Sequence, residues 1–231
     1  MDKINFSIDN NDFSCEKGKT IVEAAKENGI YIPVLCYFEG LKPVGTCRIC
    51  TVKVNGKPMA ACTTMVTEGM DIEFDTPELN DMRKAIVEML FVEGNHFCPS
   101  CEKSGNCELQ ALAYKFQMMV PRFLFAFPLK DIDATHPKLI LERNRCVLCK
   151  RCVRGIKTEN GRSLFALSKR GSRVSIEISK ELADQVTDEL AEKAMEICPV
   201  GAIIKKEKGF DEPIGTRRFD KNPIGSDIEK K

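Results

Sequence analysis

The chain has 231 residues, of which 43% are hydrophobic, which is enough apolar material for two or three modest cores. Its 35 Lys and Arg residues nearly balance its 34 Asp and Glu residues, which excludes a strong overall attraction to nucleic acid or to an anionic membrane. No secretory signal opens the sequence, and no apolar run approaches the ~18 residues that span a membrane. We therefore expect a cytoplasmic protein of several small domains, without a membrane span or a nucleic-acid partner.

The first 77 residues have the pattern of a small α+β domain. Alternating apolar residues from Ile4 onward predict a hairpin that turns over 9–12. Thr20 is placed to cap a helix over 21–28, with Gly29 as its stop. The further expected features are a strand over 51–54, a turn at Asn55-Gly56 and a closing strand over 70–74.

A second domain is expected over 78–134. It begins with a helix, because Thr76-Pro77-Glu78 combines a cap, a first-turn proline and an early acidic residue. The helix should reach Gly94 and pack a stripe of apolar side chains into the core: Leu79, Met82, Ile86, Met89 and Leu90. A compact cysteine segment and a helix over 108–117 follow, and the aromatic stretch between Pro121 and Pro128 is expected to wrap over neighbouring structure.

The third domain is expected over 135–206, with a cysteine triplet, a hairpin of strands 164–167 and 174–178, and a helix over 187–197. Residues 207–231 are rich in Gly, Pro and charge and show little periodicity. We expect this tail to run over the surface or onto a partner subunit.

The 12 cysteines are better interpreted as metal ligands than as disulfides, because cytosolic thiols are kept reduced. The first set is Cys36, Cys47, Cys50 and Cys62. One tight pair between two distant ligands is similar to 2Fe-2S ferredoxins, although the spacing before Cys47 is longer than in the plant type. Gly40, Gly45 and Thr46 lie in this loop, where glycines would let backbone N–H groups approach the sulfurs. A zinc site is the alternative, but zinc ribbons usually pair two C-x2-C knuckles.

The third set has the most specific pattern. Cys146, Cys149 and Cys152 form C-x2-C-x2-C, and Cys198 before Pro199 supplies a remote fourth thiolate, as in bacterial ferredoxins with 4Fe-4S clusters. The ligand positions of the second cluster of a two-cluster ferredoxin are occupied here by Ile156, Asp188, Ala191 and Ala194. One cluster has therefore been lost, and the four ligands of the other have been retained.

The middle set is His96, Cys98, Cys101 and Cys107. Three thiolates and one histidine can hold a 4Fe-4S cluster, whose reduction potential a neutral imidazole would raise, or a zinc ion in a knuckle. Cys15 is left over and is interpreted as a small buried apolar residue, and His136 as an ordinary loop residue.

Six cations surround the Cys146 triplet: Arg143, Arg145, Lys150, Arg151, Arg154 and Lys157. Four thiolates leave an iron–sulfur cluster with a net negative charge, so nearby cations would favour its reduced form. A solvated basic face is an equally good interpretation of any one of them.

The ordered motifs resemble the N-terminal region shared by the large iron–sulfur subunit of respiratory complex I, iron-only hydrogenases and the small diaphorase subunit of NAD-reducing nickel–iron hydrogenases. The resemblance rests on the Cys36 set, on Glu93 through Gln110, and on Arg145 through Cys152 with Cys198-Pro199. The usual histidine motif is H-x3-C-x2-C-x5-C, whereas here only Phe97 separates His96 from Cys98.

Two further features favour the hydrogenase diaphorase family, in its NAD-reducing or electron-bifurcating form. The segments Pro213 to Gly215 and Pro223 to Ile228 are similar to that subunit. The complex I and iron-only hydrogenase subunits continue into large C-terminal domains that do not follow in this sequence.

The resemblance implies an α+β fold: a β-grasp 2Fe-2S ferredoxin-like domain, a small helical domain with a His/Cys-ligated 4Fe-4S cluster, and a bacterial-ferredoxin-like 4Fe-4S domain. It implies one 2Fe-2S and two 4Fe-4S clusters in a non-catalytic electron-transfer subunit of an oxidoreductase. No G-x-G-x-x-G sequence follows an expected strand, so flavin, NAD and nickel should lie on partners. The partners implied are an FMN-containing NADH-oxidising subunit and the small and large subunits of a nickel–iron hydrogenase.

Three alternatives stay open on the sequence. The chain could be the equivalent relay of an NAD-dependent formate dehydrogenase, part of a complex I-like enzyme, or a zinc-stabilised binding protein without redox activity.

Overall fold

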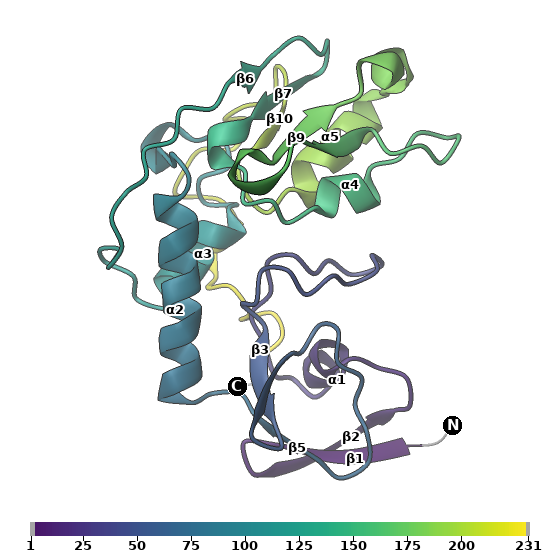
Figure 1. Cartoon of the computed structure of the whole chain (residues 1–231), viewed down its shortest axis with the longest axis vertical. Helices are drawn as coiled ribbons and strands as arrows, with labels where there is room; N and C mark the ends of the chain where they lie inside the picture. The colour runs from purple at the N-terminus through teal and green to yellow at the C-terminus, as the bar shows by residue number, and fades with distance from the viewer. Residues whose placement is uncertain (1–2, 230–231) are drawn as a thin grey trace.

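The structure is a computed structural model that describes residues 3–229, and it has the expected mixture of helices and strands (Figure 1). The strands are β1 (Lys3–Ile8), β2 (Asn11–Glu16), β3 (Thr51–Val54), β4 (Lys57–Ala60), β5 (Met70–Glu73), β6 (Ile132–Asp133), β7 (Leu139–Glu142), β8 (Phe165–Ser168), β9 (Ser175–Ile178) and β10 (Ile203–Lys205). The α-helices are α1 (Ile21–Glu27), α2 (Pro77–Val92), α3 (Glu108–Lys115), α4 (Arg151–Gly155), α5 (Asp188–Ile197) and α6 (Arg218–Lys221). Short 3-10 turns occur at Cys98–Ser100, Arg143–Arg145, Gly171–Arg173 and Lys180–Gln185.

The N-terminal part, lower in Figure 1, is a five-stranded sheet with α1 packed against it. The strand order is β2-β1-β5-β3-β4, in which β1 and β5 are parallel and the other pairs antiparallel. Positive φ angles at Asp9, Asn10, Asn55 and Gly56 form the two tight hairpin turns. The sequence prediction missed β4, because this edge strand contains Pro58 and exposes three of its four residues.

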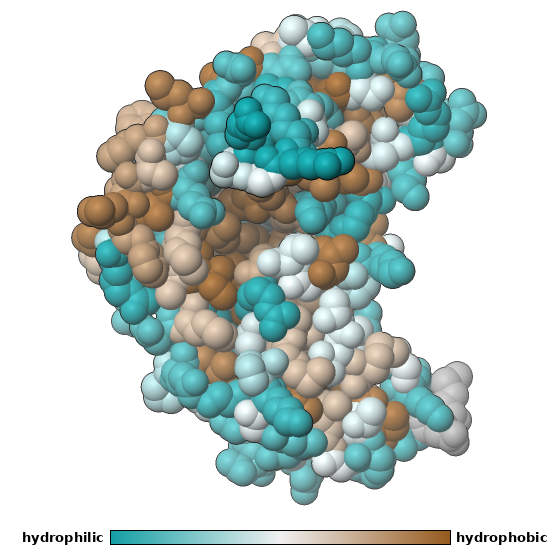
Figure 2. Space-filling model, in the orientation of Figure 1, coloured by the Kyte–Doolittle hydropathy of each residue, from teal (hydrophilic) through white to brown (hydrophobic). Residues whose placement is uncertain are grey.

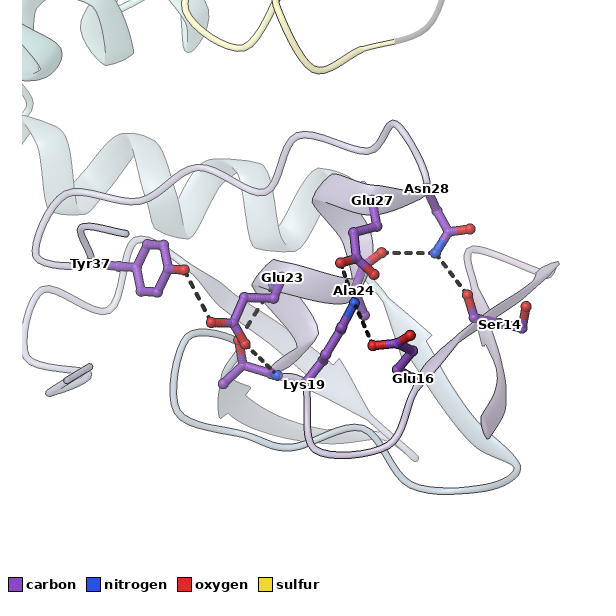
Figure 3. Close-up of polar contacts among 9 residues, drawn as sticks. Ser14, Glu16, Lys19, Glu23, Ala24, Glu27, Asn28 and Tyr37 are labelled. Carbon is purple, nitrogen blue, oxygen red and sulfur yellow. Dashed lines mark hydrogen bonds and ion pairs between the residues drawn. The ribbon is translucent and has the colours of Figure 1, made fainter. Parts of the chain in front are cut away.

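Helix α1 begins after the predicted cap, Thr20, whose backbone N–H donates to the Glu23 carboxylate at 2.8 Å. Figure 3 shows that Glu23 also accepts the Tyr37 hydroxyl, at 3.4 Å. At the other end of the helix, the Asn28 side chain donates to the Ser14 carbonyl of β2, at 3.2 Å. The helix is therefore tied both to the sheet and to the loop that carries the first candidate ligand.

Helix α2 buries part of the predicted stripe and also two charged residues that were not predicted to be buried. Its buried residues are Leu79, Arg83, Val87, Glu88 and Val92. Of the predicted stripe only Leu79 is fully buried, while Met89 is 40% exposed and Met82, Ile86 and Leu90 are partly buried. The prediction is confirmed for Leu79, Ile86 and Leu90, which are buried or pack against the core, and is wrong for Met89. It missed Arg83 and Glu88, for which the fold supplies hydrogen-bonding partners that allow burial.

The C-terminal half, upper in Figure 1, contains two small sheets, β10-β7-β6 and β8-β9. The second is the predicted hairpin, and the predicted helix over 187–197 is α5. The pairing of β7 with β10 was not predicted, because both strands are short and they lie far apart in the sequence. This antiparallel pair brings the segment after Cys198 back beside the segment before Cys146.

Two apolar cores hold these parts together. One lies between α1 and the five-stranded sheet and includes Cys15, which is 5% exposed and confirms its interpretation as a buried apolar residue. The other extends through the C-terminal half and includes Tyr31, Leu35 and Ile49 from the N-terminal part. The N-terminal part therefore packs on the rest of the chain through apolar side chains.

The C-terminal tail packs along the chain itself, and in Figure 1 its yellow trace runs from the upper half towards the lower sheet. Arg217 is 3% exposed and donates to the carbonyls of Glu102 and Ser104, at 2.6 and 2.7 Å. Lower down, Ile224 is buried and Lys115 pairs with Glu229 at 2.9 Å. Of the two predicted courses, the tail takes the one over the surface of its own chain.

Residues 118–129, which we call the apolar segment, follow α3 and lie against α2. The N–H of Ala126 donates to the carbonyl of Val92 at 2.9 Å, and Arg122 pairs with the buried carboxylate of Glu88 at 2.7 Å. The backbone is held in this way, but most of the side chains face solvent, and Leu124 and Leu129 are each 95% exposed. Brown side chains gather on this side of the molecule in Figure 2.

Candidate metal centres

The four cysteines of the first set lie close to one another in the N-terminal part. Cys36 and Cys62 are fully buried and Cys50 is 1% exposed. Hydrogen bonds from the Cys47 and Cys62 thiols lower the pKa of Cys36, and a hydrogen bond from the Cys62 thiol lowers the pKa of Cys50. Thiols that share protons in this way must lie side by side, so the structure brings this predicted set together.

The loop around these cysteines also directs polar donors towards sulfur. The backbone N–H of Cys47 and the hydroxyl of Thr46 both donate to Cys36. Arg48, between Cys47 and Cys50, has a left-handed φ of 61°, which turns the chain within the tight pair. Donors to thiolate sulfur stabilise its negative charge, which is what an iron–sulfur cluster requires of its surroundings.

The third set surrounds a cavity. Cys146, Cys149, Cys152 and Cys198 all line it, together with apolar side chains from β7, β9 and β10. Burial raises the pKa of Cys146 to about 11 and that of Cys149 to about 12. Thiols that are costly to ionise in an apolar cavity become favourable thiolates when they bind metal, so this donor set fits a 4Fe-4S cluster.

The backbone of the triplet turns so that its N–H groups can face the sulfurs. Leu148 and Lys150 both have left-handed φ angles, of 51° and 60°. The N–H groups of Leu148 and Arg151 interact with the Cys146 and Cys149 thiols and lower their pKa values, against the larger effect of burial. Alternating right- and left-handed residues form the anion-binding concavities found at many Fe–S sites.

The positions of the lost second cluster are filled by packing. Ile156, Ala191 and Ala194 are fully buried, and both alanines lie on α5. Asp188 is instead at the exposed start of that helix, where it pairs with Lys138 at 3.1 Å. Three of these four positions are therefore part of the apolar core.

The middle set lies between the end of α2 and the start of α3. Cys107 caps α3, with its sulfur 3.5 Å from the N–H of Gln110, and burial raises its pKa to about 12. The thiols of Cys98 and Cys101 act electrostatically on Cys107. Cys101 also packs on the segment after Cys198, where a Cβ on Gly201 would lie 2.5 Å from its sulfur. Only glycine permits this approach, so Cys101 of the middle set packs closely on the segment that follows Cys198.

His96 is held as a neutral imidazole with one free nitrogen. Burial lowers its pKa to about 4, and Arg145 and Lys130 add to this effect. Its ring lies 5.2 Å from that of Phe91, and its Nε2 atom is buried without a hydrogen-bonding partner. A Cβ on Gly94 would lie 2.3 Å from this nitrogen. A buried, unpartnered and unprotonated nitrogen fits a metal ligand.

The arginines near the triplet connect the three sets to one another. Arg145 pairs with Glu102 at 2.6 Å, beside Cys101, and Arg151 forms two bonds with Glu108, at 2.6 and 2.7 Å, beside Cys107. Arg154 donates to the carbonyl of Cys36 at 2.6 Å. A solvated basic face is therefore the wrong interpretation for these arginines, because each makes a specific contact that links parts of the chain far apart in sequence.

His136 is not an ordinary loop residue as predicted. It is 5% exposed, and its Nδ1 accepts the N–H groups of Lys138 and Leu139, at 3.1 and 3.2 Å. Burial lowers its pKa, so the ring is neutral and fixes the start of β7. The sequence offered no signal for this, because the burial of His136 depends on distant residues.

Membrane spans and single-ion sites are both absent from the part of the chain that the structure describes. No helix among residues 3–229 combines the length and apolar composition needed to cross a bilayer. Within the same range, no three His, Cys, Asp or Glu side chains are arranged to hold a single metal ion. A multinuclear iron–sulfur cluster, in contrast to a single ion, is held by ligands spaced around a larger group.

Family models match most of the chain. A 2Fe-2S iron–sulfur cluster binding domain matches residues 1–77, and the NADH-ubiquinone oxidoreductase-G iron–sulfur binding region matches 83–122. The ferredoxin-like domain of NADH-quinone oxidoreductase subunit 3 matches 136–204. The fold and these matches define an iron–sulfur protein of the electron-transfer class, with 2Fe-2S and 4Fe-4S binding domains.

The relatives identify the family within this class. The gamma subunit of the NAD-reducing hydrogenase HoxS of Cupriavidus necator is 50% identical over 218 residues, which cover 94% of this chain and 93% of that subunit. A crystal structure of an NAD+-reducing [NiFe]-hydrogenase in the H2-reduced state contains a chain with a TM-score of 0.88 and 40% identity, aligned over 96% of this chain and 95% of that one. The chain belongs to the family of NAD-reducing hydrogenase gamma subunits.

The similarity to complex I is more distant. One NADH-quinone oxidoreductase chain of Rhizobium meliloti is 32% identical over 209 residues, and the aligned part covers 87% of this chain but only 24% of that relative. This similarity agrees with the predicted relationship to the N-terminal region of the large complex I iron–sulfur chain.

Proposed function

We propose that this chain relays electrons, one at a time, between a hydrogenase module and an FMN-containing module that exchanges electrons with NAD. Cys36, Cys47, Cys50 and Cys62 would hold a 2Fe-2S cluster, and two 4Fe-4S clusters would be held by the sets of His96 and of Cys146. When bound, such clusters supply reversible one-electron chemistry without substrate or proton transfer. The domain boundaries at 77, 134 and 206 belong to the same proposal.

The observation that carries the proposal is the chain of contacts between ligand sets. Arg154 of α4, two residues after Cys152, holds the backbone carbonyl of Cys36 at 2.6 Å. Arg151 of the same helix holds Glu108, which follows Cys107. The third set is therefore the central one, with protein contacts to both others.

The apolar segment supports the role of a subunit in a larger assembly. Leu124, Leu129 and Met119 are 95%, 95% and 89% exposed, and Phe125 stacks on Phe127 with ring centroids 5.4 Å apart. Contiguous exposed apolar surface marks interaction sites in soluble proteins. We propose that a partner subunit of the hydrogenase complex covers it.

The test is anaerobic isolation of the native complex with metals, acid-labile sulfide and flavin measured together. We expect iron, sulfide, nickel and FMN, with EPR signals of one 2Fe-2S and two 4Fe-4S clusters assigned to this chain. Molybdenum in place of nickel would point to a formate dehydrogenase, and zinc without iron or sulfide would overturn the proposal.

A further inference from the structure

Arg83 is a fully buried cation in the middle of α2, and it contacts the loop that carries Cys50 of the first ligand set. Its guanidinium donates to the carbonyls of Ile49 at 3.3 Å and of Thr51 at 2.8 Å. These two residues directly precede and follow Cys50. It also donates to the carbonyl of Phe74 at 2.9 Å and to the side-chain oxygen of Asn80 at 2.8 Å. Among the described residues, all of these partners are neutral.

A buried cation without a charged partner is costly, because burial removes its hydration and neutral carbonyls return only part of that free energy. Burial lowers the pKa of Arg83 to about 10, so it stays charged at neutral pH. The negative groups that face it are Asp75, Cys50 and Asp9. The counter-charge that stabilises the buried guanidinium of Arg83 must therefore be one of these three groups.

The two carboxylates accept hydrogen bonds from neutral groups and lie outside the ligand set. Asp9 accepts the N–H groups of Phe74 and Asp75, at 2.7 and 3.1 Å. Asp75 lies at the exposed surface and accepts the Asn80 amide at 2.6 Å. Cys50, by contrast, is 1% exposed, in a region where charges are poorly screened. Of these three groups Asp75 acts most strongly on Arg83 but is exposed, whereas Cys50 is the one that is fully buried.

We propose that Arg83 is the fixed counter-charge of the cluster held by Cys36, Cys47, Cys50 and Cys62, and that it raises the reduction potential of that cluster. This inference rests on the proposed function, which assigns a cluster to the set. One added electron makes the cluster more negative, and a cation held nearby stabilises the reduced form more than the oxidised form. Arg83 is a positioning residue, since it acts through the backbone on both sides of Cys50 and through its charge.

The test is a redox titration of the intact complex, followed by the EPR signal of the reduced 2Fe-2S cluster. Arg83→Gln removes the charge and keeps an amide that can donate to a carbonyl. We expect the equilibrium constant for one-electron reduction of this cluster to fall about tenfold, which equals about 59 mV, with both 4Fe-4S clusters unchanged. Arg83→Lys keeps the charge but loses the forked guanidinium, so we expect a lower thermal stability and an equilibrium constant for reduction within threefold of the wild type.

The matched control is Lys84→Gln, which removes the same charge from the next residue, where the side chain reaches the exposed carbonyl of Gln117. We expect no change in the potential of the 2Fe-2S cluster. Equal shifts in Arg83→Gln and Lys84→Gln, or no shift in either, would overturn the proposal.

The proposal can still be tested if Arg83→Gln does not fold. In that case the redox titration is made on Arg83→Lys, which keeps the charge. A tenfold fall in the equilibrium constant for reduction of the 2Fe-2S cluster in this variant would refute the counter-charge role. Loss of the fold in both variants would assign Arg83 a purely structural role and refute the proposal as well. Absence of a 2Fe-2S signal in the wild-type complex would instead refute the proposed function.

Discussion

His96 differs from the cysteine ligands in the charge that it would bring to a cluster. A neutral imidazole in place of a thiolate removes one negative charge, which should make its cluster easier to reduce. Its surroundings enforce the neutral form, since burial and the positive charge of Arg145 lower its pKa to about 4. The free Nε2 beside Gly94 is the atom available to metal.

Replacing this side chain tests the middle set directly. In His96→Ala we expect the EPR spectrum of one 4Fe-4S cluster to change, while the 2Fe-2S cluster and the other 4Fe-4S cluster keep their spectra. Low-temperature EPR of the reduced complex measures this. Unchanged spectra for all clusters would show that His96 is not a ligand.

His136 should make stability depend on pH in a defined direction. Its pKa is lowered in the fold by burial, so the unfolded chain binds the proton first. Stability from the neutral ring is full above the unfolded pKa of about 6.5 and is lost as the pH falls below it. We expect the melting temperature to fall between pH 8 and pH 5.5, and to fall less in His136→Asn, whose side-chain oxygen can accept the same N–H groups. Equal pH dependence in both proteins would contradict this account.

At the scale of elements, helix α4 is the junction of the molecule. It begins at Arg151, which is 1% exposed, pairs with Glu108 of α3 and stacks on Phe38 at 5.4 Å. Arg154 of the same helix reaches the carbonyl of Cys36. A helix of five residues has little stability of its own, so these contacts hold it in place as much as it holds the neighbouring loops.

Removing the central arginine should loosen the junction. Arg151→Ala leaves Glu108 partly buried without its bidentate partner, and we expect a loss of about 3 kcal/mol in the free energy of unfolding. Denaturant unfolding followed by circular dichroism under anaerobic conditions measures the change. Arg162→Ala is the control, because its pair with Glu181 is exposed at both ends, and we expect a loss below about 1 kcal/mol. Equal losses in the two variants would contradict the role of the buried pair.

At the scale of the whole molecule, charge and apolar surface are distributed differently. The net charge of +1 gives no long-range field, whereas the apolar segment concentrates exposed Leu, Met and Phe side chains on one side of α2. Its backbone is held by the contacts of Arg122 and Ala126, so the side chains are presented in a fixed arrangement. A preformed apolar surface loses little conformational entropy when a partner covers it.

A charge placed on this surface should weaken assembly without unfolding the chain. Leu124 is 95% exposed, so Leu124→Glu removes few internal contacts. We expect at least tenfold weaker association with the partner subunits and an unchanged melting temperature of the chain, measured by sedimentation and by thermal unfolding. Met65→Glu, at a 48% exposed position of the N-terminal part, is the control and should assemble normally. Normal assembly of Leu124→Glu would exclude the segment from the interface.

Cysteine spacing by itself determined which residues form each candidate set, because cluster ligands are recognised by local spacing and by a few remote partners such as Cys198-Pro199. Local pattern likewise predicted α1, α2 and the β8-β9 hairpin, since caps and turn residues act within a few positions. Only the tertiary structure decided which charges are buried. Arg83, Glu88 and Arg151 obtain hydrogen-bonding partners from other parts of the chain, and the cost of burying a polar group depends on those partners.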